Sequence, residues 1–342
     1  MSIKFQWMQT SIQKINSYCL VILALVALTG VLIYTKAALL PFTIGLFVYA
    51  LASPTVSLLE KKLKVPKWLS LILTIILVCS FATLVVFLIT ISIQDFIQGA
   101  GIYKQKVIQF VNWATEFLQT MGYDFNVQYL KQELRNFPVF KIMQNLTGDI
   151  FSLLGNVVLV LIFSMFLLIG DFQSKEKHPL FEEIQNKIAK YVATKFLTSL
   201  STGVIVGVIL WIVGGELVFM FALLTMLLNF IPSIGSIIAT LVPLPVLLLQ
   251  FGFGWEFISA FIAMGITQFF IGNVLEPKVM GESMDLHPIT IMIFLIFWGL
   301  VWDVPGMFMA VPITALVKIV LGRIPSLQPL SELMAGRIKI ES

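Results

Sequence analysis

The sequence has 342 residues, of which 58% are hydrophobic and only 12% charged, with a formal net charge of +4. Soluble domains carry roughly 25% charged residues, so this composition excludes a surface that mainly faces water and indicates one that faces lipid. The small positive charge lies beside predicted turns and gives no reason to expect a nucleic-acid partner.

Residues 1–93 are predicted to form the first three transmembrane spans. Each span needs about 20 largely apolar residues, and the runs that qualify are Tyr18–Tyr34, Leu39–Leu59 and Trp68–Ile93. The loop after the second run holds four lysines and one acid (Glu60, Lys61, Lys62, Lys64 and Lys67). Positive loops stay inside the cell, so we expect this loop and the N-terminus to be cytoplasmic.

Residues 94–149 are then expected outside, as a small periplasmic helical subdomain. Their positive and negative residues balance, as is usual for an exported loop. Apolar residues repeat at helical spacing from Val107 to Met121 and stop at Gly122, and a shorter helix is predicted to begin near Asn126.

Residues 150–322 are predicted to form a transmembrane transport core, followed by a cytoplasmic tail over 323–342. The core has full spans at Ile150–Gly170, Phe196–Gly215 and Phe257–Leu275, and an amphipathic cytoplasmic elbow helix at 178–195. Within the second of these spans, Ser199, Gly203 and Gly207 are spaced by four, which favours close approach of another helix.

Two apolar stretches of the core are interrupted. Leu217–Trp255 contains no Asp, Glu, Lys or Arg and is divided at Asn229–Ser236, where Pro232 removes a backbone donor and Gly235 permits a turn. Each arm has about 15 residues and reaches about 22 Å, less than the ~30 Å hydrocarbon core. His287–Trp302 and Val304–Val317 repeat this layout around Pro305 and Gly306.

These stretches are interpreted as two opposed re-entrant hairpins, with pairs of ordinary kinked spans as the alternative. Re-entrant backbone must be buried in protein or line a wet cavity, and transporters use it to bind solutes near mid-membrane. The predicted fold is therefore an all-α polytopic membrane protein with about six full spans and two interrupted hairpins.

Polar residues in and beside these stretches are the candidate solute or ion pathway. They are Asn229, Pro232, Ser233, Gly235, Gln268, Asn273, Glu276 and Asp303. Asn273 and Glu276 stand one helical turn apart and could face one cavity; the alternative is a solvated loop in which the Asn caps or packs. For Glu282 and Asp285 the solvated loop is favoured.

Catalytic and nucleotide-binding patterns are absent. The sequence has no Walker motif, no His-Glu-x-x-His and no Gly-x-Ser-x-Gly. We expect no enzyme activity, no catalytic residues, no metal site and no cofactor.

The last third of the chain resembles the autoinducer-2 exporter family of bacterial permeases. The resemblance rests on "NFIPSIGSIIA" (Asn229–Ala239), "IGNVLEPKVMGESMDLHPI" (Ile271–Ile289) and "PGMFMAVPITALVKIV" (Pro305–Val320). Besides Pro232, Gly235 and Asn273, the positions that match the family's motifs are Pro277, Gly281, His287, Pro288, Gly306 and Pro312. Glu276 and Asp303 lie where members vary.

The resemblance implies a multi-pass protein of the bacterial inner membrane that forms a homo-oligomer and has cytoplasmic termini. It favours a secondary transporter that exports a small polar solute such as autoinducer-2, with or without ion coupling. A sodium (or lithium)/proton antiporter is one alternative, and a passive channel or membrane scaffold is another. The expected partners are a small molecule or monovalent ion and the lipid bilayer.

Overall fold

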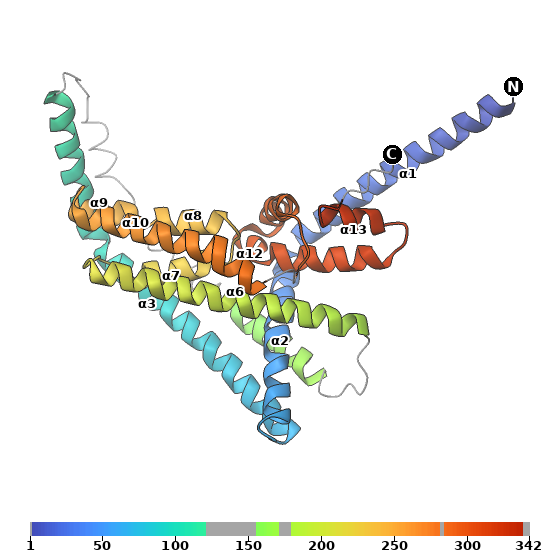
Figure 1. The fold of residues 1–342 in the computed structure, drawn as a ribbon, viewed down its shortest axis with the longest axis horizontal. Helices are drawn as coiled ribbons and strands as arrows, with labels where there is room; N and C mark the ends of the chain where they lie inside the picture. The colour runs from blue at the N-terminus through green and yellow to red at the C-terminus, as the bar shows by residue number, and fades with distance from the viewer. Residues whose placement is uncertain (1, 121–154, 171–178, 281–283, 338–342) are drawn as a thin grey trace. The chain divides into compact units, whose positions relative to one another are not determined.

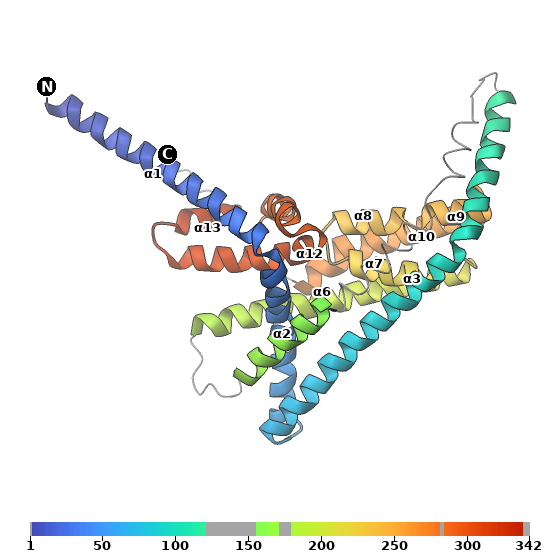
Figure 2. The ribbon, with the colours of Figure 1, turned by 180° about the vertical axis from the view of Figure 1, so that it is seen from behind.

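The computed structural model describes residues 2–120, 155–170, 179–280 and 284–337, which are helical almost throughout and contain no strand (Figure 1; Figure 2 shows the reverse side). Internal contacts divide the chain into two compact units. Unit 1 comprises Met1–Gly45 and Asp285–Ser342, and unit 2 comprises Leu46–Met284.

The predicted polytopic all-α class is confirmed. In the described part of the chain, 6 helical stretches are long and apolar enough to cross a membrane: Lys36–Lys61, Lys67–Ser92, Glu182–Ile212, Ile234–Phe251, Trp255–Leu275 and Pro288–Arg323. Shorter apolar helices occupy Cys19–Tyr34, Gly155–Gly170 and Val218–Leu228.

Unit 2 is built around α6, which spans Pro179–Ile212. The helices α7 (Val218–Leu228) and α10 (Trp255–Phe270) pack against it, and α8 (Ile234–Leu241) and α9 (Leu244–Phe251) contact α10 in turn (Figure 1). A π-helical turn, η1 (Ile271–Leu275), continues α10 into the short α11 (Glu276–Met280), which also contacts α6.

The small residues of α6 allow α7 to approach closely, as their spacing predicts. A Cβ added at Gly203 would lie 2.8 Å from the carbonyl oxygen of Ala222, and one added at Gly207 would lie 3.0 Å from the Ala222 side chain. The glycines therefore fix where the α7 backbone rests on α6.

Two helices of unit 2 are longer than the sequence pattern indicated. The helix α3 runs unbroken from Lys67 to Thr120, so the predicted third span and the periodic segment after it form one helix of 54 residues. The predicted elbow at 178–195 likewise continues into the following span as the single helix α6. The predicted helix near Asn126 lies outside the described residues.

The first interrupted stretch contains the predicted break. Between α7 and α8, Ser233 has φ 58° and ψ −58°, and the chain turns so sharply that an added Cβ at Gly235 would lie 1.8 Å from the carbonyl oxygen of Leu228. Seven residues of straight helix advance about 10 Å, so this contact requires a reversal of direction. The second arm is itself divided into α8 and α9 near Pro243.

Unit 1 contains α1 (Ser2–Tyr34), the start of α2 (Lys36–Lys61), α12 (Pro288–Arg323) and α13 (Gln328–Met334). Within α12, Trp302 and Asp303 have non-helical backbone angles, with φ 53° at Asp303. An added Cβ at Gly306 would lie 2.0 Å from the carbonyl oxygen of Trp298. Eight residues of straight helix advance about 12 Å, so the chain bends sharply here too.

Both breaks thus share one local construction. A non-glycine residue adopts a left-handed φ, and a glycine two or three positions later lies against a carbonyl of the preceding arm. Each glycine is needed because any side chain would collide with backbone, which cannot move aside as a flexible side chain can.

We expect Gly235→Ala to destabilise the protein by about 1–3 kcal/mol, because the new methyl group must force the two arms apart. The matched control is Gly265→Ala in α10, where an added Cβ meets nothing within 4 Å. Thermal unfolding of the purified protein in detergent measures both. Equal midpoints for the two variants would contradict the proposed role of the close contact.

Candidate functional site

One face of α6 is buried along its length and changes character midway. Going from its N-terminal half to its C-terminal end, the buried residues include Tyr191, Lys195, Thr198, Ser199 and Thr202, then Val206 and Leu210. The same change occurs on α7, where buried Phe221 is followed by Thr225 and then Asn229, and on α10, where Ala260 and Met264 are followed by Gln268. The three helices therefore enclose a polar region next to an apolar one.

We call this polar region the polar row. It comprises Lys195, Thr198, Ser199 and Thr202 of α6, Thr225 of α7, Asn229 directly after α7, Ser236 of α8 and Gln268 of α10.

Asn229 connects three helices within the polar row. Its Nδ2 donates to Ser199 Oγ at 3.3 Å and to Thr202 Oγ1 at 3.4 Å, and its Oδ1 accepts from Ser236 Oγ at 3.2 Å. Because Asn229 is the residue at which α7 ends, the break between α7 and α8 is tied to the middle of α6 by side-chain hydrogen bonds. Pro232 and Ser233 lie at the break itself, with Ser233 exposed.

Gln268 and Thr225 have buried polar atoms without partners. Neither Oε1 nor Nε2 of Gln268 makes a hydrogen bond, and the same holds for Thr225 Oγ1. A buried amide without partners costs about 1–3 kcal/mol. These atoms are therefore available to bind a polar molecule inside the bundle.

Lys195 and Glu276 form an ion pair at the end of the polar row. The Lys195 side chain is only 2% exposed and that of Glu276 17%, and the Lys195 ammonium donates to the Glu276 carboxylate. The sequence interpretation singled out Glu276 but missed Lys195, because it was assigned to the charged elbow. The available signal was the helical spacing of Tyr191, Lys195 and Ser199, which continues into the apolar span.

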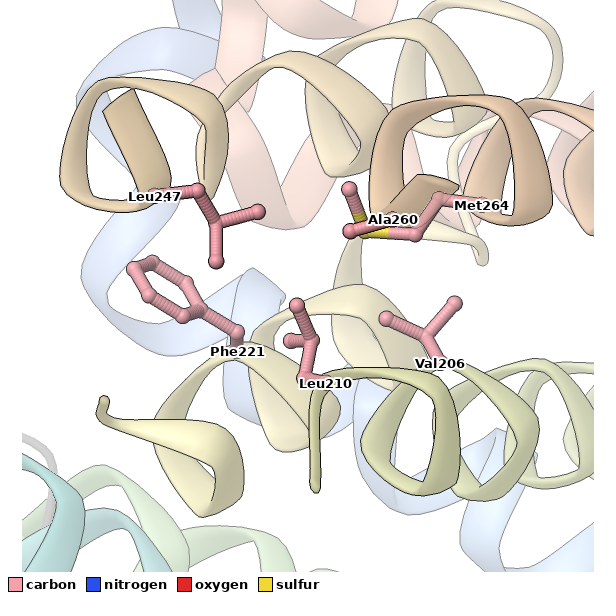
Figure 3. Close-up of a cluster of buried hydrophobic side chains, with 6 residues drawn as sticks. All are labelled: Val206, Leu210, Phe221, Leu247, Ala260 and Met264. Carbon is pink, nitrogen blue, oxygen red and sulfur yellow. The ribbon is translucent and has the colours of Figure 1, made fainter. Parts of the chain in front are cut away.

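The opposite end of the polar row meets a cluster of apolar side chains. Figure 3 shows six of them pointing toward one another from four helices: Val206, Leu210, Phe221, Leu247, Ala260 and Met264. We call this set the apolar cluster. Beyond it, at the same end of unit 2, Lys106 of α3 pairs with Glu216 at 2.7 Å.

Asn273 and Glu276 do not share surroundings. The Asn273 side chain is exposed and donates to the carbonyl of Phe269 at 3.1 Å, whereas Glu276 faces α6. The π-helical turn over Ile271–Leu275 has more residues per turn than an α-helix, so positions three apart no longer lie above one another.

Asp303 lies at the break in α12, in unit 1, and is 72% exposed. Its carboxylate pairs with Lys36 at the start of α2, and the neighbouring Trp302 donates from Nε1 to the carbonyl of Leu32 at 3.1 Å. An ion pair this exposed contributes little to stability. These contacts hold the break against the junction of α1 and α2.

Asp285, for which a solvated loop was expected, instead binds two cations of unit 1. Its carboxylate lies 2.5 Å from Lys318 Nζ and 2.7 Å from a terminal nitrogen of Arg337. Burial raises the pKa of Asp285, but the hydrogen bonds and charges of Lys318 and Arg337 outweigh it, so the pKa lies below its ordinary value. The interaction is therefore retained at neutral pH and lost only as strong acid protonates the carboxylate.

The remaining motif residues have structural surroundings. His287 caps α12 and accepts from Ile289 N–H at 3.3 Å, Pro288 is the first residue of that helix, and an added Cβ at Gly336 would lie 2.5 Å from the His287 ring. Gly306 and Pro312 are buried in α12, and Pro277 lies in α11. Gly281 and Glu282 lie outside the described residues. The described residues contain no group of three metal-ligating side chains.

Comparison with known proteins shows to which class of protein this chain belongs. A protein of Haemophilus influenzae named "Putative transport protein" is 30% identical over 307 residues, covering 84% of this chain and 86% of its own. The Escherichia coli "AI-2 transport protein TqsA" is 25% identical over 314 residues, covering 88% and 90%. The Escherichia coli "Putative permease PerM" is 40% identical over 76 residues, covering 22% of each chain.

With its spanning helices and a buried polar region among them, this is a multi-pass membrane transport protein. The model of the AI-2E transporter family matches residues 21–326, and the chain belongs to that family.

Removing one member of the buried ion pair should be costly. We expect Lys195→Met to destabilise the protein by about 3–5 kcal/mol, since it leaves the Glu276 carboxylate buried without a counter-ion, and Lys195→Met/Glu276→Leu to recover most of that loss. Unfolding of the purified protein in detergent measures both effects.

The control is Lys187→Met, which breaks the solvent-accessible pair with Glu183 on the same helix and should cost less than about 1 kcal/mol. The interpretation fails if Lys195→Met is as stable as that control, or if the double variant is no better than the single one.

Proposed function

We propose that this protein exports a small polar solute across the bacterial inner membrane, and that the polar row of unit 2 is its path. The observation that carries the proposal is the Gln268 amide, buried with neither polar atom bonded, in a bundle that otherwise satisfies Asn229 from three sides. A protein interior rarely retains such a group unless something else binds it.

The kind of solute follows from the groups present. Apart from Lys195, the polar row offers hydroxyl and amide groups, which both donate and accept hydrogen bonds and carry no charge. They suit a small neutral molecule rich in hydroxyl groups. The similarity to a protein named an AI-2 transport protein supports a signal of the autoinducer-2 type as the first candidate to test.

A second candidate function is exchange of sodium or lithium for protons. It is favoured by Glu276, a partly buried carboxylate that faces a buried ammonium group and could exchange that partner for another cation. This function needs no path for a solute, so it does not explain the unpartnered amide of Gln268.

The transport test uses purified protein in proteoliposomes, with labelled autoinducer-2 and with imposed sodium, lithium and proton gradients. Gln268→Leu keeps the side-chain volume and removes the amide, so we expect the solute flux to fall at least tenfold. The same change should stabilise the fold by about 1–3 kcal/mol, because it removes a buried group without partners. Higher stability with lower flux distinguishes a binding residue from a structural one.

The control is Thr267→Val, at the residue next to Gln268. The Thr267 hydroxyl already donates to the carbonyl of Ala263 in the same helix. Solute flux unchanged by Gln268→Leu would overturn the assignment of the path. Proton movement driven by a sodium or lithium gradient, without solute flux, would favour the antiporter. Solute flux that no ion gradient can drive against the solute's own concentration gradient would favour a passive channel.

We also propose that both termini are cytoplasmic and that the protein is a homo-oligomer, as the family resemblance implies. In this orientation the end of α3 at Thr120 is periplasmic and the turn after α2, with Lys62, is cytoplasmic. The pairing of Lys106 with Glu216 indicates that both residues lie on one side of the membrane, which this orientation makes the outer side.

Cysteine labelling tests the orientation, after Cys19 and Cys79 are changed to serine. A membrane-impermeant maleimide should label Thr120→Cys in spheroplasts, whereas Lys62→Cys should react only after the membrane is permeabilised. The reverse pattern would place the termini outside.

A further inference from the structure

The polar row is closed at its two ends by different chemistry. At one end the apolar cluster fills the space between α6, α7, α9 and α10 (Figure 3). At the other end the buried pair of Lys195 and Glu276 joins α6 to α11. The members of the row on α6, α7 and α10 are buried, whereas Ser236 of α8 is partly exposed. A solute that moves along the row must therefore pass one of these two ends.

The ion pair lies at the boundary between buried and solvated residues. On α6, Lys195 is buried, whereas Lys190 and Glu182, nearer the start of the helix, are exposed. On α11, Glu276 faces α6, while Lys278 is exposed. The pair thus lies near the water at that end, with buried Tyr191 one helical turn beyond it on α6, and the proposed orientation makes this end cytoplasmic.

We propose that Lys195 and Glu276 form an ion-pair gate, which must separate for a solute to pass between the cytoplasm and the polar row. This inference rests on the proposed transport function. When the pair is closed, each buried charge is neutralised by the other. When α11 moves away, water enters and hydrates both groups, so the open state has no unpaired buried charge and both states are accessible.

The helix that carries Glu276 is joined to α10 by an irregular turn. The π-helical turn over Ile271–Leu275 interrupts the regular α-helical hydrogen bonding between them, and such turns are frequent at functional sites. Ile271, directly after α10, is buried, whereas an added Cβ at Gly272, the next residue, would meet nothing within 4 Å. A bend at this turn would displace α11 while Met264 and Gln268 stay in place.

Among the described helices, α7, α8 and α10 bring almost no further charge to the pair. The helices α7 and α8 contain no charged residue, and the only one on α10 is Glu256 in its first turn, at the far end. Buried Tyr191 lies one turn from Lys195 on α6. The helices α7, α8 and α10 therefore supply no cation in place of Lys195 and no acid near Glu276.

The first test measures access to the polar row without measuring transport. Ser236→Cys is introduced as a reporter, with Cys19 and Cys79 changed to serine, and is labelled with a water-soluble maleimide in vesicles of each orientation. Lys195→Ala/Glu276→Ala should raise the labelling rate at least tenfold from the Lys62 side and leave it unchanged from the other. The control is Glu183→Ala/Lys187→Ala, which removes a surface pair from the same helix and should change neither rate.

The second test holds the gate closed. In the same cysteine-free background, Lys195→Cys/Glu276→Cys is joined by a short bifunctional methanethiosulfonate reagent, which dithiothreitol removes. Crosslinking should reduce flux in proteoliposomes at least tenfold, and reduction should restore it. The single variants Lys195→Cys and Glu276→Cys, treated in the same way, control for simple modification.

The outcomes separate this inference from the function on which it rests. Undiminished flux after complete crosslinking, or faster reporter labelling from both sides, would overturn the gate while leaving the transport function in place. Side-specific labelling in a protein that moves no tested solute would support the gate and contradict the proposed substrate.

Discussion

The hydrocarbon core of a membrane contains no water, so every polar group placed there must find its partner within the protein. This constraint explains where the chain is irregular and where it is not. The break after α7 is possible because Asn229 ties it to Ser199 and Thr202 of α6 and to Ser236 of α8. At the break in α12, Trp302 donates a hydrogen bond to the carbonyl of Leu32, while the Asp303 carboxylate is exposed and pairs with Lys36.

The buried polar groups that do not follow this constraint, or follow it at a cost in stability, are the most informative about function. Gln268 keeps both polar atoms buried and unbonded, which lowers the stability of the fold. Lys195 and Glu276 satisfy each other, but two apolar residues of similar size would be at least as stable. Groups that cost stability in this way are best explained by what they do when the bundle changes shape or takes up a ligand.

The sequence predicted the features that depend on local chemistry. Pro232 and Gly235 located the first break, and the proline and glycine near Asp303 located the second, because both residue types restrict the backbone directly. Gln268 and Asn229 were conspicuous within apolar runs. Lys195 was missed because its charge alone assigned it to a solvated helix. The different surroundings of Asn273 and Glu276 were missed because a π-helical turn leaves no clear pattern in the sequence. The partners of Asp285 lie 33 and 52 positions away in the chain, beyond the reach of local spacing.

One property of α6 has a mechanical consequence. The same unbroken helix of 34 residues carries Lys195 and, on the same buried face, Val206 and Leu210 of the apolar cluster. Lys195 and Leu210 are about 22 Å apart along its axis, with Thr202 and its bond to Asn229 between them. A stiff rod that tilts about a point between its ends moves those ends in opposite directions. If α6 tilted about its contact with Asn229, the ion pair at one end would separate while the apolar cluster at the other end packed more tightly. The two ends of the polar row would then not be open at the same time.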